Sequence, residues 1–445
     1  MTHAARLADF AIGFPGGSLP TQLATTVNRY ILDIAAVAAA GSNTRTARQA
    51  RQAAPRLFGR GETAMWFDGA SVTVKAAVFA NATAASILDL DDGHRAALGH
   101  PGAGIIPAVL AAAPADTSWN NVVDAIAIGY EVALRVGAGR PAIPLTAVSS
   151  GRWVGIGVAA AVARLRGLSA TQTTHAIAIA TTMAPDLAAF GYVRETGNSV
   201  KEGISWASVT GLAAVDLAEV GHTGPRDIFD HASHYVGEEI IDGLGDQWLA
   251  HRAYLKRYSC CRWIHALIDG IFELRAQHTI PVELIKSIEV ETFEHALGLG
   301  NEVDPMTIEG AQYSIPYCTA LACVSQPEVF LPLTEAHLHQ PGAVRLSKLV
   351  KMTVGTDLQE MFPVRTPGRI RIITGSDTFV RTVLHPLGDP ANPLSDEALF
   401  DKCRQLCVSA GCPQLPNTIA GILLEPGVDA LTRINAALAD APASR

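Results

Sequence analysis

The sequence has few aromatic and few charged residues. Aromatic residues make up 6% of the chain and charged residues 17%, whereas hydrophobic residues make up 49%. This composition can bury a large core and argues against intrinsic disorder. No long lysine/arginine block is present and the formal net charge is -8, which argues against nucleic-acid binding. Abundant alanine beside scarce aromatics favours closely packed helices over a β-sandwich.

Cysteine patterns typical of metal sites are also missing. None of the seven cysteines, including the adjacent Cys260 and Cys261, has the paired spacing of zinc or iron–sulfur ligands. We expect reduced, mostly buried thiols. No apolar run reaches the length that spans a bilayer, and residues 1–17 carry Asp9 and lack the apolar core of a signal peptide. These absences predict a soluble, cytoplasmic protein without a membrane partner.

The hydrophobic periodicity changes twice along the 445 residues. Up to about residue 270, and again from 396 to 445, apolar residues recur at helical spacing. Between about 280 and 395, short alternating segments indicate strands. We therefore predict a mainly α protein, in which residues 1–270, completed by 396–445, form a large all-helical domain and residues 280–395 form a smaller α+β lid domain. Expected helices include 20–40, 45–56, 71–89, 119–136, 170–182, 199–219 and 309–325, and expected strands are 285–292, 349–354, 369–374 and 378–384.

One polar segment interrupts the helical sequence. Three aspartates and two histidines (Asp89, Asp91, Asp92, His94 and His100) lie within twelve residues, between two apolar, alanine-rich stretches. Polar groups next to buried helices cost free energy unless they are paired or used. The segment could be a solvated loop with capping side chains, a metal site, because Asp and His are both ligands, or an acid–base site for an anionic substrate.

Two basic regions stand further along the chain. If Asn198 caps a helix over 199–219, Lys201 lies in its first turn, where the helix dipole disfavours a cation and favours a neutral amine or a substrate carboxylate. Lys256, Arg257 and Arg262 form a second patch that could hold carboxylates. The simpler alternative for Lys201 is a surface lysine, and for the second patch it is a basic, capped surface helix.

Taken together, these segments resemble the MmgE/PrpD family, which includes 2-methylcitrate dehydratase, cis-aconitate decarboxylase and iminodisuccinate epimerase. The resemblance covers nearly the whole chain and rests on several short segments in the expected order. They are Asn81 with residues 88–92, residues 100–102, Lys201 with Gly203 and Gly211, residues 221–225, residues 256–261 with His265, residues 313–317 and residues 388–395.

The resemblance implies a helical domain built from both termini, a smaller lid, a homodimer, and no cofactor or metal. It implies that the active site lies between the domains and takes a small polycarboxylate. Lys201 and His100 are the implied catalytic pair. The residues expected to bind or orient the substrate are Asp89, Asp92, His94, Lys256, Arg257, Tyr258, His265 and Tyr313.

The chain departs from the family at several positions. Val148 stands where dehydratase- and decarboxylase-like members typically carry a histidine, and Ser86 replaces a second histidine. Gly93 replaces a usual threonine. These changes remove candidate acids for expelling hydroxide but keep His100 and Lys201.

Two retained bases on opposite faces of a substrate would satisfy an epimerase, which removes and returns a proton next to a carboxylate and expels nothing. We therefore expect epimerisation of an iminodisuccinate-type substrate. The alternative is a lyase: a 2-methylcitrate dehydratase-like hydro-lyase or a cis-aconitate decarboxylase-like enzyme. A protein that binds carboxylates without catalysis is a third reading, because fold alone does not determine function.

Overall fold

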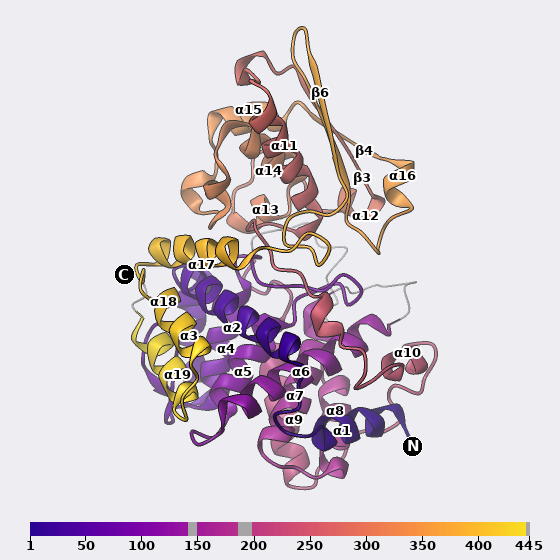
Figure 1. The fold of residues 1–445 in the computed structure, drawn as a ribbon, viewed down its shortest axis with the longest axis vertical. Helices are drawn as coiled ribbons and strands as arrows, with labels where there is room; N and C mark the ends of the chain where they lie inside the picture. The colour runs from indigo at the N-terminus through magenta and orange to yellow at the C-terminus, as the bar shows by residue number, and fades with distance from the viewer. Residues whose placement is uncertain (141–148, 186–197, 442–445) are drawn as a thin grey trace.

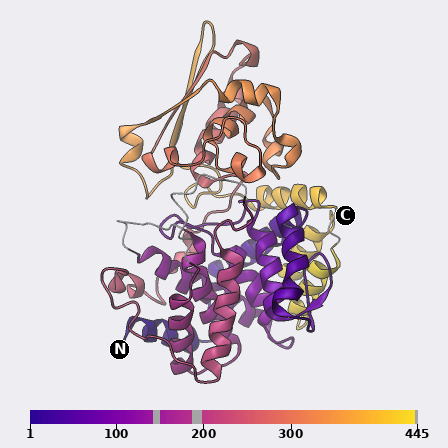
Figure 2. The ribbon, with the colours of Figure 1, turned by 180° about the vertical axis from the view of Figure 1, so that it is seen from behind.

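A computed structural model describes residues 1–140, 149–185 and 198–441. It has two bodies, stacked along the long axis in Figures 1 and 2. The larger body is helical and the smaller one contains a four-stranded sheet. The predicted fold class, mainly α with a smaller α+β part, is confirmed.

The larger body is built from both ends of the chain. Its core joins apolar side chains from the first 255 residues to others beyond residue 393. Its main helices are α1 (His3–Gly13), α2 (Thr21–Ser42), α3 (Arg45–Phe58), α4 (Val74–Ser86), α5 (Gly102–Ala112), α6 (Trp119–Ala138), α7 (Val154–Leu165), α8 (Ala170–Thr182), α9 (Ile204–Glu219), the short α10 (Gly237–Ile241), α17 (Asp396–Ala410), α18 (Leu415–Leu424) and α19 (Ala430–Asp440). A short hairpin, β1 (Thr63–Ala64) and β2 (Ser71–Val72), precedes α4.

Small residues let the central helices approach closely. A Cβ on Gly157 of α7 would lie 2.2 Å from the Gly129 carbonyl oxygen of α6, and one on Gly155 would lie 2.3 Å from the Ala207 carbonyl oxygen of α9. Only glycine fits such contacts, since added atoms would force the helices apart. The glycines therefore bring the starts of α7 and α9 together.

Helix α17 lies over α2 at the border between the two bodies (Figure 1). Its Lys402 reaches Asp33 of α2 at 2.7 Å, and neither side chain is exposed. The Lys402 ammonium also donates to the Leu90 carbonyl at 3.1 Å. A buried charge needs such partners, so this contact ties the C-terminal segment to the polar segment after α4.

Helix α2 corrects one expectation. Its 22 residues are long and apolar enough to cross a membrane by length and composition, although we expected no such run. Most of its apolar window, 67%, is buried inside the protein. Helices of a protein core pass the same test, and α2 packs on α4, α6 and α17 in this way.

The smaller body pairs its strands in the order β4-β3-β5-β6. Strand β3 (Ser287–Thr292) runs parallel to β4 (Val350–Val354) and antiparallel to β5 (Gly368–Ile373), which forms a hairpin with β6 (Thr378–Val383). Helices α11 (His265–Gln277) and α14 (Ile315–Val324) pack together, α11 on β5 and β6 and α14 on β4. The remaining helices are α12 (Glu294–Leu297), α13 (Ile308–Gln312), α15 (Pro341–Ser347) and α16 (Thr356–Gln359).

Three expected elements differ from the structure. The helix expected over 309–325 breaks between α13 and α14, and the one over 71–89 begins only at Val74. The helix expected over 199–219 begins at Ile204, because Lys201 and Gly203 adopt left-handed φ angles of 47° and 70°.

The expected domain boundary near residue 270 falls inside α11, which packs on the sheet. We propose instead a boundary before Tyr258, the first residue of the second core. The boundary near 395 stays a prediction.

Candidate active site

The polar segment runs from the end of α4 at Ser86 to the start of α5 at Gly102. Its aspartates are almost without exposed surface, at 1% for Asp89, 1% for Asp91 and 0% for Asp92, and His100 is 6% exposed. The plain reading as a solvated loop is therefore wrong. Buried carboxylates require partners, and these come from distant parts of the chain.

Asp89 binds two lysines. The Lys256 ammonium lies 2.7 Å from its Oδ2 and the Lys201 ammonium 3.2 Å from its Oδ1. Lys201 also donates to the Ser86 carbonyl oxygen at 2.7 Å. Burial by itself raises the pKa of Asp89, but the lysines outweigh it and hold that pKa below its usual value. Asp89 is therefore a carboxylate that holds two ammonium groups side by side.

The structure does not place Lys201 in the first turn of a helix, which was the reason to expect a neutral amine there. The residue stands in a turn before α9, outside its first helical turn. Its ammonium is paired with the Asp89 carboxylate and donates to the Ser86 carbonyl oxygen. The fully buried Lys256 is held in the same way: burial lowers its pKa, but Asp89 and then Asp91 raise it above the usual value.

His100 is surrounded by acceptors. Its Nδ1 lies 2.7 Å from the Asp92 carbonyl oxygen, so this nitrogen carries a proton and donates. Its Nε2 lies 3.6 Å from Asp89 Oδ1 and 3.7 Å from Glu202 Oε1. Burial lowers the pKa of His100, but Asp91 and Glu202 outweigh it, so the pKa is raised above its usual value. The free site therefore favours imidazolium, which is a proton donor.

Asp92 plays a different part from the one expected. Its backbone carbonyl, and not its carboxylate, orients His100. The carboxylate instead accepts from the Gly102 N–H at 3.0 Å and so caps α5. Burial, followed by the charge of Asp91, raises the pKa of Asp92 to about 8. A Cβ on Gly102 would lie 2.2 Å from this carboxylate, which explains why glycine follows His100-Pro101.

Glu202 is a site residue that our sequence analysis missed. Its Oε2 accepts from the Ser150 N–H at 3.1 Å and is also bonded to the Ser150 hydroxyl. The Ser150 hydroxyl oxygen accepts from the His100 N–H at 2.8 Å. The only local signal for Glu202 was its position next to Lys201, because Ser150 is 52 residues away along the chain.

The starts of three helices converge here. His100, Ser150 and Glu202 contact one another, and each directly precedes a helix: α5, α7 after a single 3₁₀ turn (Ser150–Arg152), and α9. The N-cap residues of these helices make no side-chain capping bond, although the Asp92 carboxylate accepts from the first N–H of α5. Helix N-termini carry partial positive charge, so together with two lysines they favour an anionic ligand.

Tyr313 lies near this cluster, at the break between α13 and α14. Burial, with the carboxylates of Asp89 and Glu202 next in effect, raises its pKa well above the usual value. Its phenol is a hydrogen-bond donor at any ordinary pH. The smaller body thus contributes a side chain to a site made mainly by the larger one.

Three other expected residues have structural partners instead. The Tyr258 hydroxyl donates to Asp269 at 2.7 Å. His265 contacts the Cys260 carbonyl oxygen at 3.2 Å, and burial lowers its pKa. His94 accepts from the Ala97 N–H at 3.2 Å, and burial lowers its pKa to about 3.

The fourth, Arg257, is half-buried, and its Nη1 has no hydrogen-bond partner among the described residues. The structure therefore brings together Asp89, His100, Lys201 and Lys256 with Tyr313 close by. It does not bring Tyr258 or His94 to the cluster, whereas the His265 ring lies close enough to Lys256 and Asp89 for their charges to act on its pKa.

The family departures receive a partial explanation. A Cβ on Gly93, where threonine is usual, would lie 2.5 Å from the Tyr254 hydroxyl. The Ser86 hydroxyl bonds within α4, to the Ala82 carbonyl at 2.8 Å, while its own carbonyl holds Lys201. Val148 lies outside the described residues.

Asp89, His100 and Glu202 also place one potential metal-ligand atom each within 4.8 Å of one another. The donor set would suit a divalent ion. However, two ammonium groups already occupy both oxygens of Asp89 and would repel a cation there. The metal-free reading of the site stays a prediction.

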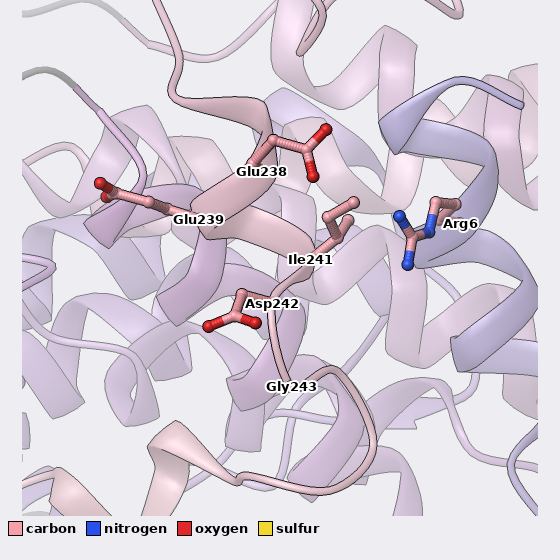
Figure 3. Close-up of a pocket in the computed structure, with 6 residues that line it drawn as sticks. All are labelled: Arg6, Glu238, Glu239, Ile241, Asp242 and Gly243. Atoms are coloured by element: carbon pink, nitrogen blue, oxygen red, sulfur yellow. The ribbon is translucent and has the colours of Figure 1, made fainter.

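A separate surface hollow of about 460 Å³ lies where α10 meets α1 (Figure 3). Three of its six lining residues carry carboxylates, and none of the six belongs to the buried cluster. Its lining consists of Arg6, Glu238, Glu239, Ile241, Asp242 and Gly243.

Comparison with known proteins also divides the chain into two parts. The MmgE/PrpD N-terminal domain model matches residues 5–236, and the C-terminal domain model matches residues 258–414. The chain is 26% identical to the cis-aconitate decarboxylase-like protein oryM of Aspergillus oryzae, and the match covers 91% of this chain and 90% of that protein. A cis-aconitate decarboxylase of Aspergillus terreus is 23% identical over 96% of this chain and 94% of its own.

Proposed function

Because the chain belongs to the MmgE/PrpD family, we propose that it is a lyase that decarboxylates a small unsaturated tricarboxylate of the cis-aconitate type. The observation that carries the proposal is the position of His100, whose Nε2 faces the carboxylates of Asp89 and Glu202 beside the ammonium groups of Lys201 and Lys256. The relatives named as cis-aconitate decarboxylases support the same reaction class.

Such a decarboxylation needs a proton donor and held carboxylates. When the bond to a CH₂-linked carboxylate breaks, its electron pair forms a new C=C bond, and the old C=C bond takes up one proton. One carbon dioxide leaves for each proton consumed. In our proposal His100 supplies this proton, while Lys201, Lys256 and the helix N-termini hold the remaining carboxylates. Burial of the site removes water from the departing carboxylate.

The epimerase expectation is less well supported. A two-base reaction needs groups that accept protons from opposite faces of the substrate. Lys201 is paired with Asp89, and both Lys201 and His100 approach the same oxygen, Asp89 Oδ1. They lie side by side and not on opposite faces of a substrate, and the raised pKa of His100 suits proton donation.

The test is to incubate the protein in heavy water with cis-aconitate, 2-methylcitrate and an amino dicarboxylate. We expect carbon dioxide and an unsaturated dicarboxylic acid with one carbon fewer than cis-aconitate, carrying one deuterium at the newly protonated carbon. His100→Asn should lose about 10²–10⁴-fold in kcat. His339→Asn is the matched control, because His339 pairs with an aspartate, Asp304, but is exposed.

Two results would overturn the proposal. Loss of water from 2-methylcitrate without decarboxylation of cis-aconitate would establish the hydro-lyase instead. Deuterium exchange and racemisation of the amino dicarboxylate, with no carbon dioxide, would restore the epimerase.

A further inference from the structure

Glu202 is fixed to the segment that precedes α7. Its Oε2 is held by the N–H and hydroxyl of Ser150, and its own carbonyl accepts from the Gly151 N–H at 3.0 Å. These donors are neutral. They fix the direction of the Glu202 carboxylate without cancelling its charge.

The other carboxylate oxygen, Oε1, is the one that faces His100, at 3.7 Å from Nε2. Ser150 is joined to both residues, since its hydroxyl oxygen also accepts from the backbone N–H of His100. The Glu202 side chain is 14% exposed, against 2% for Asp89. Among the charged side chains described around His100, that of Glu202 is thus the most exposed to solvent.

The carboxylates near His100 are not equivalent. Both oxygens of Asp89 are paired with lysine ammoniums, which compensate its charge. The Asp91 carboxylate, at 3.5 Å from Nδ1, lies on the side of the ring that already donates to the Asp92 carbonyl. Glu202 alone among these described carboxylates combines an Nε2-facing oxygen with purely neutral partners.

We propose that Glu202 is a positioning residue that holds His100 in its proton-donating form and aims Nε2 at the substrate, with Ser150 fixing both. This role rests on the proposed lyase function. Glu202 would act through His100 by stabilising the imidazolium charge, and the Ser150 contacts would keep it from turning towards Lys201 or Lys256. Each proton spent would then be replaced at His100 from solvent on the side that Glu202 borders.

The first test needs no substrate. In protein labelled with ¹⁵N-histidine, the His100 resonances are identified by their absence from His100→Asn, and their titration is followed by NMR. We expect Glu202→Gln to lower the titration midpoint by about one pH unit, since a neighbouring carboxylate favours imidazolium. Ser150→Ala, which keeps the carboxylate but frees it, should lower it less. Glu219→Gln removes the same charge at the far end of α9 and should change nothing.

The second test uses turnover. In Glu202→Gln the fall of kcat on the alkaline side should move to lower pH by the same amount, with KM within about twofold. An unchanged His100 midpoint in Glu202→Gln would overturn the proposal even if decarboxylation is confirmed. A raised KM with an unchanged pH profile would also overturn it, because Glu202 would then contact substrate. If no lyase substrate is found, the proposed function fails, while the NMR midpoint still decides the role of Glu202.

Discussion

The Lys256 ammonium lies 2.7 Å from Asp89 Oδ2 in a place where neither side chain is more than 2% exposed. Asp89 comes from the segment after α4, whereas Lys256 comes from the segment that leads into the smaller body. The segment that joins the two bodies is therefore anchored to the larger one by a buried ion pair. A buried charge that loses its partner is strongly destabilising.

Asp89→Asn should lower the free energy of unfolding by about 3–5 kcal/mol, because two lysines lose their carboxylate. Adding Lys256→Met should recover part of this loss, which a double-mutant cycle in urea would measure. Asp401→Asn is the control, since its pair with Arg404 is exposed, and should change stability by about 0.5 kcal/mol or less. Additive effects of Asp89→Asn and Lys256→Met would contradict the coupling.

Lys201 should bind a substrate carboxylate. We expect Lys201→Met to raise KM about tenfold, which corresponds to about 1.4 kcal/mol, and Lys201→Arg to raise it less because the positive charge is kept. Steady-state kinetics would separate KM from kcat. Complete loss of kcat in Lys201→Arg, with substrate binding intact, would instead restore Lys201 as a neutral base.

Asp92 should make stability depend on pH. Its pKa is raised from the ordinary 3.8 to about 8, so the folded protein keeps a proton that the unfolded chain releases above about pH 4. This difference lowers stability as the pH rises from about 4 to about 8. Asp92→Asn lacks the titration, so its stability relative to wild type should be greater at pH 8 than at pH 5, by urea unfolding. Parallel pH curves for the two proteins would refute the shift.

Gly102 should not tolerate a side chain. A Cβ there would lie 2.2 Å from Asp92 Oδ1 and 2.3 Å from the Tyr130 hydroxyl. We expect Gly102→Ala to cost about 1–3 kcal/mol, measured by thermal unfolding. Gly13→Ala, at the end of α1, has no atom within 4 Å of the new Cβ and serves as the control. Equal melting temperatures for the two variants would show that the Asp92 region can yield.

Chelation should leave activity unchanged. A divalent ion bound by Asp89, His100 and Glu202 would have to displace Lys201 and Lys256 from Asp89. Metal analysis of the purified protein, with assays before and after dialysis against a chelator, would check this. Activity that is lost on dialysis and restored by one divalent ion would establish the metal site.

The sequence alone was sufficient where the signal is local. Apolar periodicity predicted the bounds of α8, and alternating burial along β3 follows the pattern read from its residues. Asp89 and His100 stood out as polar groups between apolar helices, whereas Lys201 and Lys256 were selected with the help of the family resemblance. Helix periodicity and capping depend on residues a few positions apart, so they can be read without the fold.

The tertiary structure decided which polar groups meet. Ser150 and Glu202 are 52 residues apart, and their contact depends on the close glycine packing of α7 on α9. Lys201 lies outside the predicted helix, in a left-handed turn that helix propensity does not predict. There its ammonium is bound to Asp89 and to the Ser86 carbonyl oxygen across the core. The Tyr258 hydroxyl donates a hydrogen bond to Asp269 of α11 and does not contact the described site residues. Such pairings are set by how helices pack in three dimensions, and the free energy of burying each polar group selects the partner that packing brings within reach.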